Sequence, residues 1–404
     1  MTRLIRFSFL TQSTGIVGVT VLCAALCAED ALAQAPLAMA NPEMRNSLAR
    51  DPGGHWTPEN LAQARPLPLP RPRKSRTELT QQQAPTPESM TAQAATAGTF
   101  STQVDGKLPP REAEVAPNLA DRLFSPGSQP AQSSTPEAQA AEFTPFDAGT
   151  EKAFFSSSRL VPVDARLEYP YRAAGKLFFE VPGQGSFICS GAVIAPRLVL
   201  TAGHCVHKGS GGAAGYHRRF LFVPAYHQGQ APYQAWNFTW VITTGSWISG
   251  GGGVPNKADF AILEMEDRRF GSEVKTIGQA TGTLGYRVNG LNPNHTKKVG
   301  YPANLDNGEV MHQVDSGHHK AAEENTVLYG SDMRGGSSGG PWIENFGVQA
   351  AGQTGGLQPN PNRVVGVTSY GFVSEDPKVQ GSSILNQEFT TILNAACAHR
   401  AGNC

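Results

Sequence analysis

Short apolar runs alternate with glycine and proline turns through the C-terminal part of the chain, from about residue 160. They begin with "YRAAGKLFFEV" (171–181), "FICSGAVIA" (187–195) and "RLVLTAGH" (197–204), and similar runs continue to "RVVGVTSYGF" (363–372). Many short strands divided by turn residues are typical of an all-β sandwich or barrel. We therefore predict an all-β domain over residues 156–404.

One helix is predicted near the C-terminus, at about residues 383–398, with Ser382 or Ser383 as its N-cap. Its apolar positions recur at spacings of three and four and so share one helical face: Leu385, Phe389, Ile392, Leu393 and Ala396.

Residues 34–155 show neither the two-residue apolar period of a strand nor the 3.6-residue apolar period of a helix. They are rich in Ala, Pro, Gln, Ser and Thr. Within them, "ARPLPLPRPRKSR" (64–76) favours an extended polyproline conformation, and its prolines lack the N–H that a strand ladder needs. Because little apolar surface is available to offset the ordering entropy, we predict a disordered pro-segment or linker over 34–155. A processing site and a solvated charge cluster both fit the basic run.

The N-terminus has the features of a targeting segment. Arg3 and Arg6 precede an apolar stretch at 15–28, and Ala31 and Ala33 form a small-x-small cleavage pattern. The stretch is shorter than the roughly 20 residues of a membrane-spanning helix. We predict a signal peptide over 1–33 and export to the periplasm or the medium, with a non-cleaved anchor as the alternative.

The 404-residue chain has 33 basic and 33 acidic residues, so its formal net charge is zero. Proteins that bind nucleic acid present a strongly basic domain or face, and no such partner is expected here. We expect a monomer that acts on protein or peptide substrates, with no membrane span in the mature chain.

Removal of the signal peptide leaves four cysteines, an even count that indicates disulfides in an exported protein. A bridge between Cys189 and Cys205 would join two adjacent strands, and closing such a loop contributes about 3 kcal/mol in the chain-entropy model. Cys397 and Cys404 are expected to pair locally, with a free or intermolecular thiol as the alternative. No metal-ligand spacing is visible, so no metal or cofactor is predicted.

Three residues from distant parts of the sequence suggest nucleophilic catalysis. His204 ends an apolar strand in "TAGHC" (201–205), and Asp259 stands in the apolar context "KADFAILEM". A buried carboxylate needs a partner, and a histidine N–H is a suitable one. In "DMRGGSSGGPW" (332–342), the hydroxyl of Ser338 needs an adjacent base, and Gly336 allows backbone N–H groups to face a developing oxyanion.

"TAGHC", the Asp259 strand and "GSSGGP" (336–341), in this order, resemble the chymotrypsin-fold serine peptidases. "FLFVPAYHQGQAPY", "VGYPANLDNGEVM" and "SRLVPVDARLEYPYRAAGKLFF" are similar to the bacterial glutamyl-endopeptidase branch. The resemblance spans about residue 159 to the C-terminus.

This resemblance implies two six-stranded antiparallel β-barrels, at about 165–275 and 280–380, with the active site between them. It further implies that His204 is the general base, that Asp259 orients it, and that Ser338 is the nucleophile. The N–H groups of Gly336 and Ser338 would form the oxyanion hole.

The resemblance also implies substrate-binding residues, although this chain departs from the family's pattern at some of these positions. Ser369, Tyr370 and Gly371 correspond to the wall that pairs with substrate backbone. Glutamate-specific members have a histidine near Thr368 and Ser369, and a threonine where this chain has Met333, so glutamate preference is not predicted. Asp332 corresponds to the carboxylate that selects Lys or Arg, but a structural aspartate that caps its own loop is an equal alternative. Ser337 replaces the aspartate with which trypsin-like zymogens bind a new N-terminus.

The predicted function is that of a secreted serine endopeptidase acting through an acyl-enzyme. Two alternatives stay open at this level: a catalytically silent binding module on the same scaffold, and an esterase with weak peptidase activity.

Overall fold

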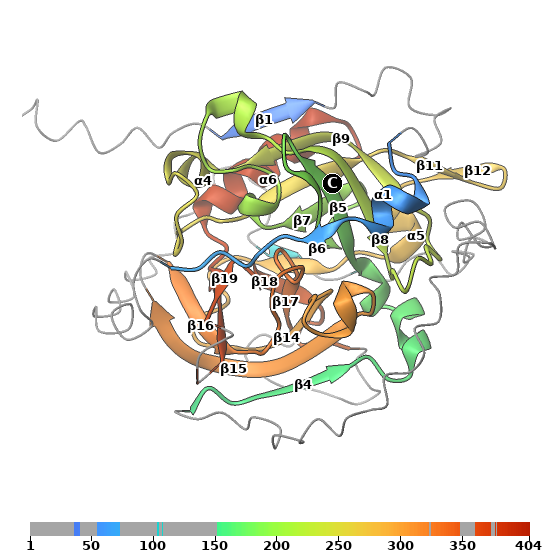
Figure 1. Ribbon diagram of the computed structural model, residues 1–404. Coiled ribbons are helices and arrows are strands. Elements are labelled where there is room, and N and C mark those ends of the chain that lie inside the picture. Colours follow the sequence, from blue (N-terminus) through green and yellow to red (C-terminus); the bar gives the residue numbers. More distant parts are fainter. Residues whose placement is uncertain are drawn as a thin grey trace, which may run out of the picture. The chain divides into compact units, whose positions relative to one another are not determined.

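The computed structural model describes residues 36–40, 55–72, 103–104, 107, 152–322, 325–347, 360–372, 376 and 378–404. The predicted signal peptide lies outside these residues. Most of the described elements are β-strands, as the pattern of short apolar runs predicts (Figure 1). No helix in the described part of the chain is long and apolar enough to cross a membrane.

Six antiparallel strands close into a barrel, because β8 pairs with both β5 and β9. Around the barrel the order is β5, β6, β7, β10, β9 and β8. Their side chains at Leu177, Leu200 and Leu263 are fully buried. The strand bounds are Ala174–Val181 (β5), Gly185–Val193 (β6), Leu198–Thr201 (β7), Arg218–Pro224 (β8), Trp236–Thr243 (β9) and Ala261–Met265 (β10).

A second sheet has the spatial order β19-β20-β16-β15-β14-β17-β18-β13-β3, with β4 paired to β15; apart from β3 and β4, its strands follow the first barrel in the sequence. Gly366 of β18 also bridges to Ile384, directly after β20, so the sheet curves back on itself. The bounds are Gln103–Val104 (β3), Phe155–Arg159 (β4), Gly285–Arg287 (β13), His295–Gly300 (β14), His312–Ala322 (β15), Thr326–Gly330 (β16), Pro341–Glu344 (β17), Arg363–Val367 (β18), Tyr370–Gly371 (β19) and Val379–Ser383 (β20).

The remaining elements are short, apart from the C-terminal helix. The strands are Leu37–Ala40 (β1), Arg65–Pro66 (β2), Arg268–Phe270 (β11) and Glu273–Lys275 (β12); the α-helices are Pro58–Ala62 (α1), Gly245–Ser249 (α4), Ile277–Thr281 (α5) and Gln387–His399 (α6). Turns of 3-10 helix span Val163–Leu167, Tyr171–Ala173, Gly203–Cys205, Gly212–Gly215 and Asp306–Gly308.

Parts of the segment 34–155 form regular structure, which differs from the disorder expected there. β1 pairs with β9, and β3 pairs with β13. β2 pairs in parallel with β6, although no ladder was expected in the proline-rich stretch. The physical reason is that Leu67, between two prolines, retains an N–H and donates it to the Ile188 carbonyl at 3.1 Å. A pre-existing sheet edge can order a segment that has too little apolar surface to fold by itself.

The C-terminal helix begins later than predicted. Ser382 and Ser383 belong to β20, and the side chain of Asn386 caps α6 by accepting from the N–H groups of Glu388 and Phe389. Asn386 satisfies orphan donors that every helix start exposes. The predicted apolar face is buried in the core: Leu385, Phe389, Ile392, Leu393 and Ala396.

Replacing Phe389 by Ala should lower the free energy of unfolding by about 3–5 kcal/mol. The ring is fully buried, with its centroid 5.9 Å from that of Phe260 and 5.4 Å from that of Tyr286. Urea denaturation followed by tryptophan fluorescence measures the change. The exposed Thr391→Ala, on the same helix, should stay within about 0.5 kcal/mol of the wild type; equal losses in both variants would contradict this packing.

Candidate active site

His204 lies in the 3-10 turn that directly follows β7. Its ring Nδ1 is 2.8 Å from Asp259 Oδ2, and its backbone N–H donates to Asp259 Oδ1 at 2.8 Å. The two contacts hold both the ring and the main chain of the histidine against one carboxylate. An acid on Nδ1 places the ring proton there and leaves Nε2 as the basic nitrogen.

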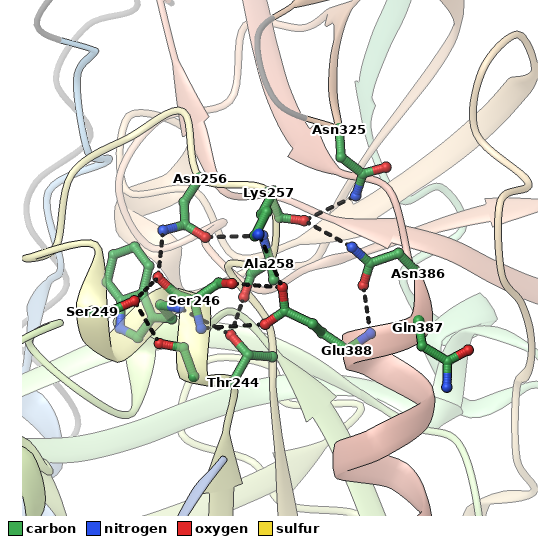
Figure 2. A network of polar contacts seen from close by, with 12 residues as sticks. Thr244, Ser246, Ser249, Asn256, Lys257, Ala258, Asn325, Asn386, Gln387 and Glu388 are labelled. Carbon is green, nitrogen blue, oxygen red and sulfur yellow. Dashed lines mark hydrogen bonds and ion pairs between the residues drawn. The ribbon is translucent and has the colours of Figure 1, made fainter. Parts of the chain in front are cut away.

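Asp259 itself is fully buried, so its position depends on the loop that precedes it. Figure 2 shows Asn325 Nδ2 and Asn386 Nδ2 donating to the Lys257 carbonyl, at 2.9 and 3.4 Å. The Asp259 N–H donates to Ser383 Oγ at 3.1 Å. Residues of the second sheet and of the C-terminal helix cap therefore fix an acid that follows the first barrel's β9.

Ser369 contributes a contact to the acid that sequence reasoning missed. Its Oγ donates to Asp259 Oδ2 at 2.5 Å. The resemblance assigned Ser369 to the substrate-binding wall, and its side chain instead completes the hydrogen bonds of the carboxylate. No local sequence signal distinguishes these two roles, because the two residues are 110 positions apart.

The loop 332–342, which we call the Ser338 loop, is bound to the strand that carries Cys189. The Ser190 N–H donates to the Ser338 carbonyl at 2.7 Å, and Ser190 Oγ donates to the Gly336 carbonyl at 2.9 Å. Gly336 has a φ of +93°, and a Cβ there would lie 2.4 Å from the Tyr301 carbonyl oxygen. The glycine is therefore required both by the backbone conformation and by close approach.

Gly339 brings the Ser338 loop against the strand end that leads to His204. It has a φ of +75°, and a Cβ on it would lie 2.1 Å from Thr201 Oγ1 and 2.8 Å from the Ala202 nitrogen. Thr201 and Ala202 immediately precede the histidine turn. The packing of this glycine thus places the serine loop beside the histidine turn.

Two buried groups at this junction make no hydrogen bond within the described residues: His204 Nε2 and Ser338 Oγ. Buried polar atoms of this kind are rare and call for an explanation. The backbone N–H groups of Gly336 and Ser338 also donate to none of the described residues. By contrast, Ser337 Oγ donates to the Arg334 carbonyl at 2.7 Å and accepts from Gln380 at 3.0 Å.

Three of the expected substrate-binding residues have side chains that are buried or hydrogen-bonded within the protein. Thr368 Oγ1 accepts from the Trp342 indole at 2.9 Å, and Tyr370 is fully buried. Met333 is also buried, and its carbonyl accepts from Gln380 Nε2 at 2.8 Å. The side chains of these three residues are therefore used in packing and internal hydrogen bonds.

Asp332 is half-buried, and its Oδ1 has no hydrogen-bond partner among the described residues. Behind it lies Lys298 of β14, whose Nζ donates to the Gly330 carbonyl at 2.9 Å. Burial lowers the pKa of Lys298 well below its ordinary value, while the carboxylates of Asp315 and Asp332 oppose that shift. Asp332 therefore interacts electrostatically with a buried amine, and its Oδ1 makes no hydrogen bond to the described residues.

Both expected disulfides are present, Cys189–Cys205 and Cys397–Cys404. One group of potential metal ligands gathers within the described residues: Cys189, Cys205 and His204. Because the two sulfurs are bonded to each other, they cannot act as thiolate ligands, and this group is not a metal site.

A closed antiparallel barrel beside a second sheet, with a buried acid–histidine pair next to a glycine-rich serine loop, is the architecture of trypsin-like serine peptidases. The family model described as "Trypsin" matches residues 168–392. The chain therefore belongs to the trypsin family of serine peptidases and is a hydrolase.

Two relatives are similar in sequence. A glutamyl endopeptidase of Bacillus licheniformis is 26% identical over 250 residues, which cover 60% of this chain and 69% of the relative. An extracellular metalloprotease of Bacillus subtilis is 26% identical over 188 residues, which cover 46% of this chain and 55% of the relative.

Solved structures of bacterial proteases are also similar. The protease Anisep from Arthrobacter nicotinovorans gives a TM-score of 0.46 at 28% identity, covering 57% of this chain and 98% of that one. A Glu endopeptidase gives a TM-score of 0.45 at 22% identity, covering 60% of this chain and 96% of that one. The family assignment rests on the sequence match.

A buried histidine beside the site makes stability depend on pH. His217 Nε2 lies 3.3 Å from the His204 carbonyl oxygen, and burial lowers the pKa of His217 to about 4. The unfolded chain has the higher pKa, near 6.5, so it binds more protons between pH 6.5 and 4. Stability should therefore fall by about 3 kcal/mol across this window as the pH decreases.

Urea midpoints measured at pH 7 and at pH 4.5 test this expectation for the wild type and for His217→Gln. The variant should lose the part of the difference that His217 contributes, whereas the parts that come from other histidines whose pKa burial lowers, such as His207 and His318, should remain. The exposed His295→Gln serves as the control and should keep the full difference; the same dependence in all three proteins would assign it to other groups.

Proposed function

We propose that the protein is a secreted serine endopeptidase that hydrolyses peptide bonds through an acyl-enzyme. The carrying observation is the buried Asp259–His204 pair, held beside the Ser338 loop, in which the Ser338 hydroxyl and the N–H groups of Gly336 and Ser338 have no partner among the described residues. A structural loop would satisfy these groups, whereas a catalytic one leaves them for the substrate.

In this mechanism, His204 Nε2 takes the proton of Ser338 as its oxygen attacks the substrate carbonyl carbon. Asp259 stabilises the imidazolium that forms and keeps the ring in its orientation. The N–H groups of Gly336 and Ser338 stabilise the negative oxygen of the tetrahedral intermediate. His204 then gives the proton to the leaving amine, and water releases the acyl group by the same steps.

The backbone of Ser369, Tyr370 and Gly371 is proposed to pair with the acyl half of the substrate. For the side chain at the cleavage site, Asp332 is the candidate determinant, since its Oδ1 has no hydrogen-bond partner among the residues that the structure describes. A basic side chain would supply the missing partner. The similarity to a glutamyl endopeptidase does not transfer its preference, because the Thr368 hydroxyl is already bound to Trp342.

Secretion is supported by the predicted signal peptide and by the two disulfides, which persist in oxidising compartments. One relative is named an extracellular metalloprotease. We expect the mature chain to act on proteins or peptides outside the cytoplasm.

Ser338→Ala should lower kcat for casein hydrolysis by up to about 10⁶-fold without loss of folding, because the nucleophile is removed while its small, buried site stays filled. Circular dichroism checks the fold, and the exposed Ser210→Ala is the matched control with normal activity. Undiminished proteolysis by Ser338→Ala would rule out this nucleophile. A short ester measured in parallel distinguishes a peptidase from an esterase.

Asp332→Ser should lower kcat/KM for cleavage after Lys or Arg by at least about 100-fold, because it removes the proposed partner of the basic side chain. Profiling on a peptide library measures the change. An unaltered profile would assign Asp332 to its loop and to Lys298.

A further inference from the structure

The proline tract, residues 65–72, contacts three parts of the candidate active site in turn. At one end, the Leu67 N–H donates to the Ile188 carbonyl at 3.1 Å, next to Cys189. At the other end, the Gly371 N–H donates to the Pro70 carbonyl at 3.3 Å. The tract therefore connects the first barrel to β19 in Figure 1, where it is drawn in blue.

Between these ends the tract lies against the Ser338 loop. A Cβ on Gly335 would lie 2.7 Å from the Leu67 carbonyl oxygen and 3.4 Å from Pro68 Cα. Gly335 directly precedes Gly336, a proposed oxyanion donor. The four residues 67–70 thus cover the interval in which a substrate backbone would have to lie.

Side chains alternate between half-buried and exposed from residue 66 to residue 69 of the tract. Leu67 and Leu69 are half-buried, whereas Pro66 and Pro68 are exposed. Leu67 packs against the main core, and Leu69 Cδ2 lies 3.3 Å from where a Gly371 Cβ would be. The leucines therefore make the apolar contacts, and the prolines hold the backbone extended at a small entropic cost.

Upstream residues anchor the tract on the first barrel. Trp56 is buried and donates its indole N–H to the Arg219 carbonyl at 2.8 Å. Leu61 of α1 is buried too, and the Arg65 guanidinium lies 4.8 Å from the Phe187 ring centroid. Such anchoring raises the effective concentration of the tract at the site.

The direction of the tract is opposite to that of a productive substrate. His204 must protonate the leaving amine, so the C-terminal half of a substrate lies towards the barrel that holds His204, Cys189 and Ile188. The N-terminal, acyl half then lies towards Gly371. The tract instead reaches Ile188 with residue 67 and Gly371 with residue 70, so its carbonyls and amide nitrogens are interchanged relative to those of a substrate.

Resting on the proposed function, we propose that residues 65–72 are an intramolecular inhibitor that occupies the substrate's backbone positions in reverse. In this orientation the serine finds no carbonyl whose leaving nitrogen faces His204. The bonds Leu67–Pro68 and Leu69–Pro70 also have tertiary amide nitrogens without a hydrogen. The tract blocks the site without being cleaved, and its departure exposes Ser338.

The test uses the full-length chain and a fluorophosphonate probe that labels an active serine. Leu67→Glu/Leu69→Glu places two carboxylates in the half-buried contacts and should release the tract, speeding Ser338 labelling about tenfold or more. Arg71→Ala, at an exposed position of the same tract, is the control and should label at the wild-type rate. Thermal unfolding checks that all three proteins fold.

Hydrogen exchange at the Gly371 amide gives a second readout that does not require activity. It should be slow in the wild type and in the control, and faster in the double variant, because the Pro70 acceptor has left. Equal exchange and equal, rapid labelling in all three proteins would overturn the inhibitor while leaving the proposed function in place. Faster exchange with no labelling in any protein would overturn the proposed function and this inference together.

Mass spectrometry of the incubated chain tests the direction. The tract should stay intact between residues 66 and 70 after prolonged incubation with active enzyme. Cleavage inside this interval that Ser338→Ala abolishes would show a substrate-like orientation and would overturn the reversed one.

Discussion

A fully buried carboxylate, Asp259, is the constraint on which the site depends. Transferring an ionised group out of water is strongly unfavourable unless charge-assisted hydrogen bonds replace the lost hydration. Here three donors do so: the His204 N–H, the His204 ring and the Ser369 hydroxyl. Two of these donors belong to His204, directly after a strand of the first barrel, and the third belongs to Ser369, between two strands of the second sheet. The hydrogen bonds of the acid are therefore complete only when the first barrel and the second sheet have both formed.

The polar groups around Asp259 divide sharply into satisfied and unsatisfied ones. The acid and its supporting loop are hydrogen-bonded throughout, up to the Asn386 cap of the C-terminal helix. His204 Nε2 and Ser338 Oγ are buried and have no hydrogen-bond partner in the part of the chain that the structure describes. This combination is what the proposed function requires: rigidity comes from the satisfied shell, and the two unpartnered atoms stay available to a substrate.

The N-terminal segments bear on the proposed inhibition through the way they are ordered. β1 and β2 extend the first barrel's sheet, and β3 extends the second, although this part of the chain has little apolar surface of its own. A segment that is ordered only by the surface on which it lies can leave that surface without unfolding the domain. Such marginal order suits an inhibitor that has to be released.

By itself, the sequence determined the fold class, the helical face from Phe389 to Ala396, the two disulfide pairs and the candidate chemistry, because apolar periodicity and residue type are local properties. It did not determine that Asn386 caps the last helix, that Ser369 binds the acid, or that residues 65–72 lie across the Ser338 loop. These depend on contacts between residues roughly 100 to 300 positions apart, or on competition between a strand and a helix for the same serines. Only the tertiary structure brings such groups within hydrogen-bond range, and hydrogen bonds decide which of several chemically suitable residues is used.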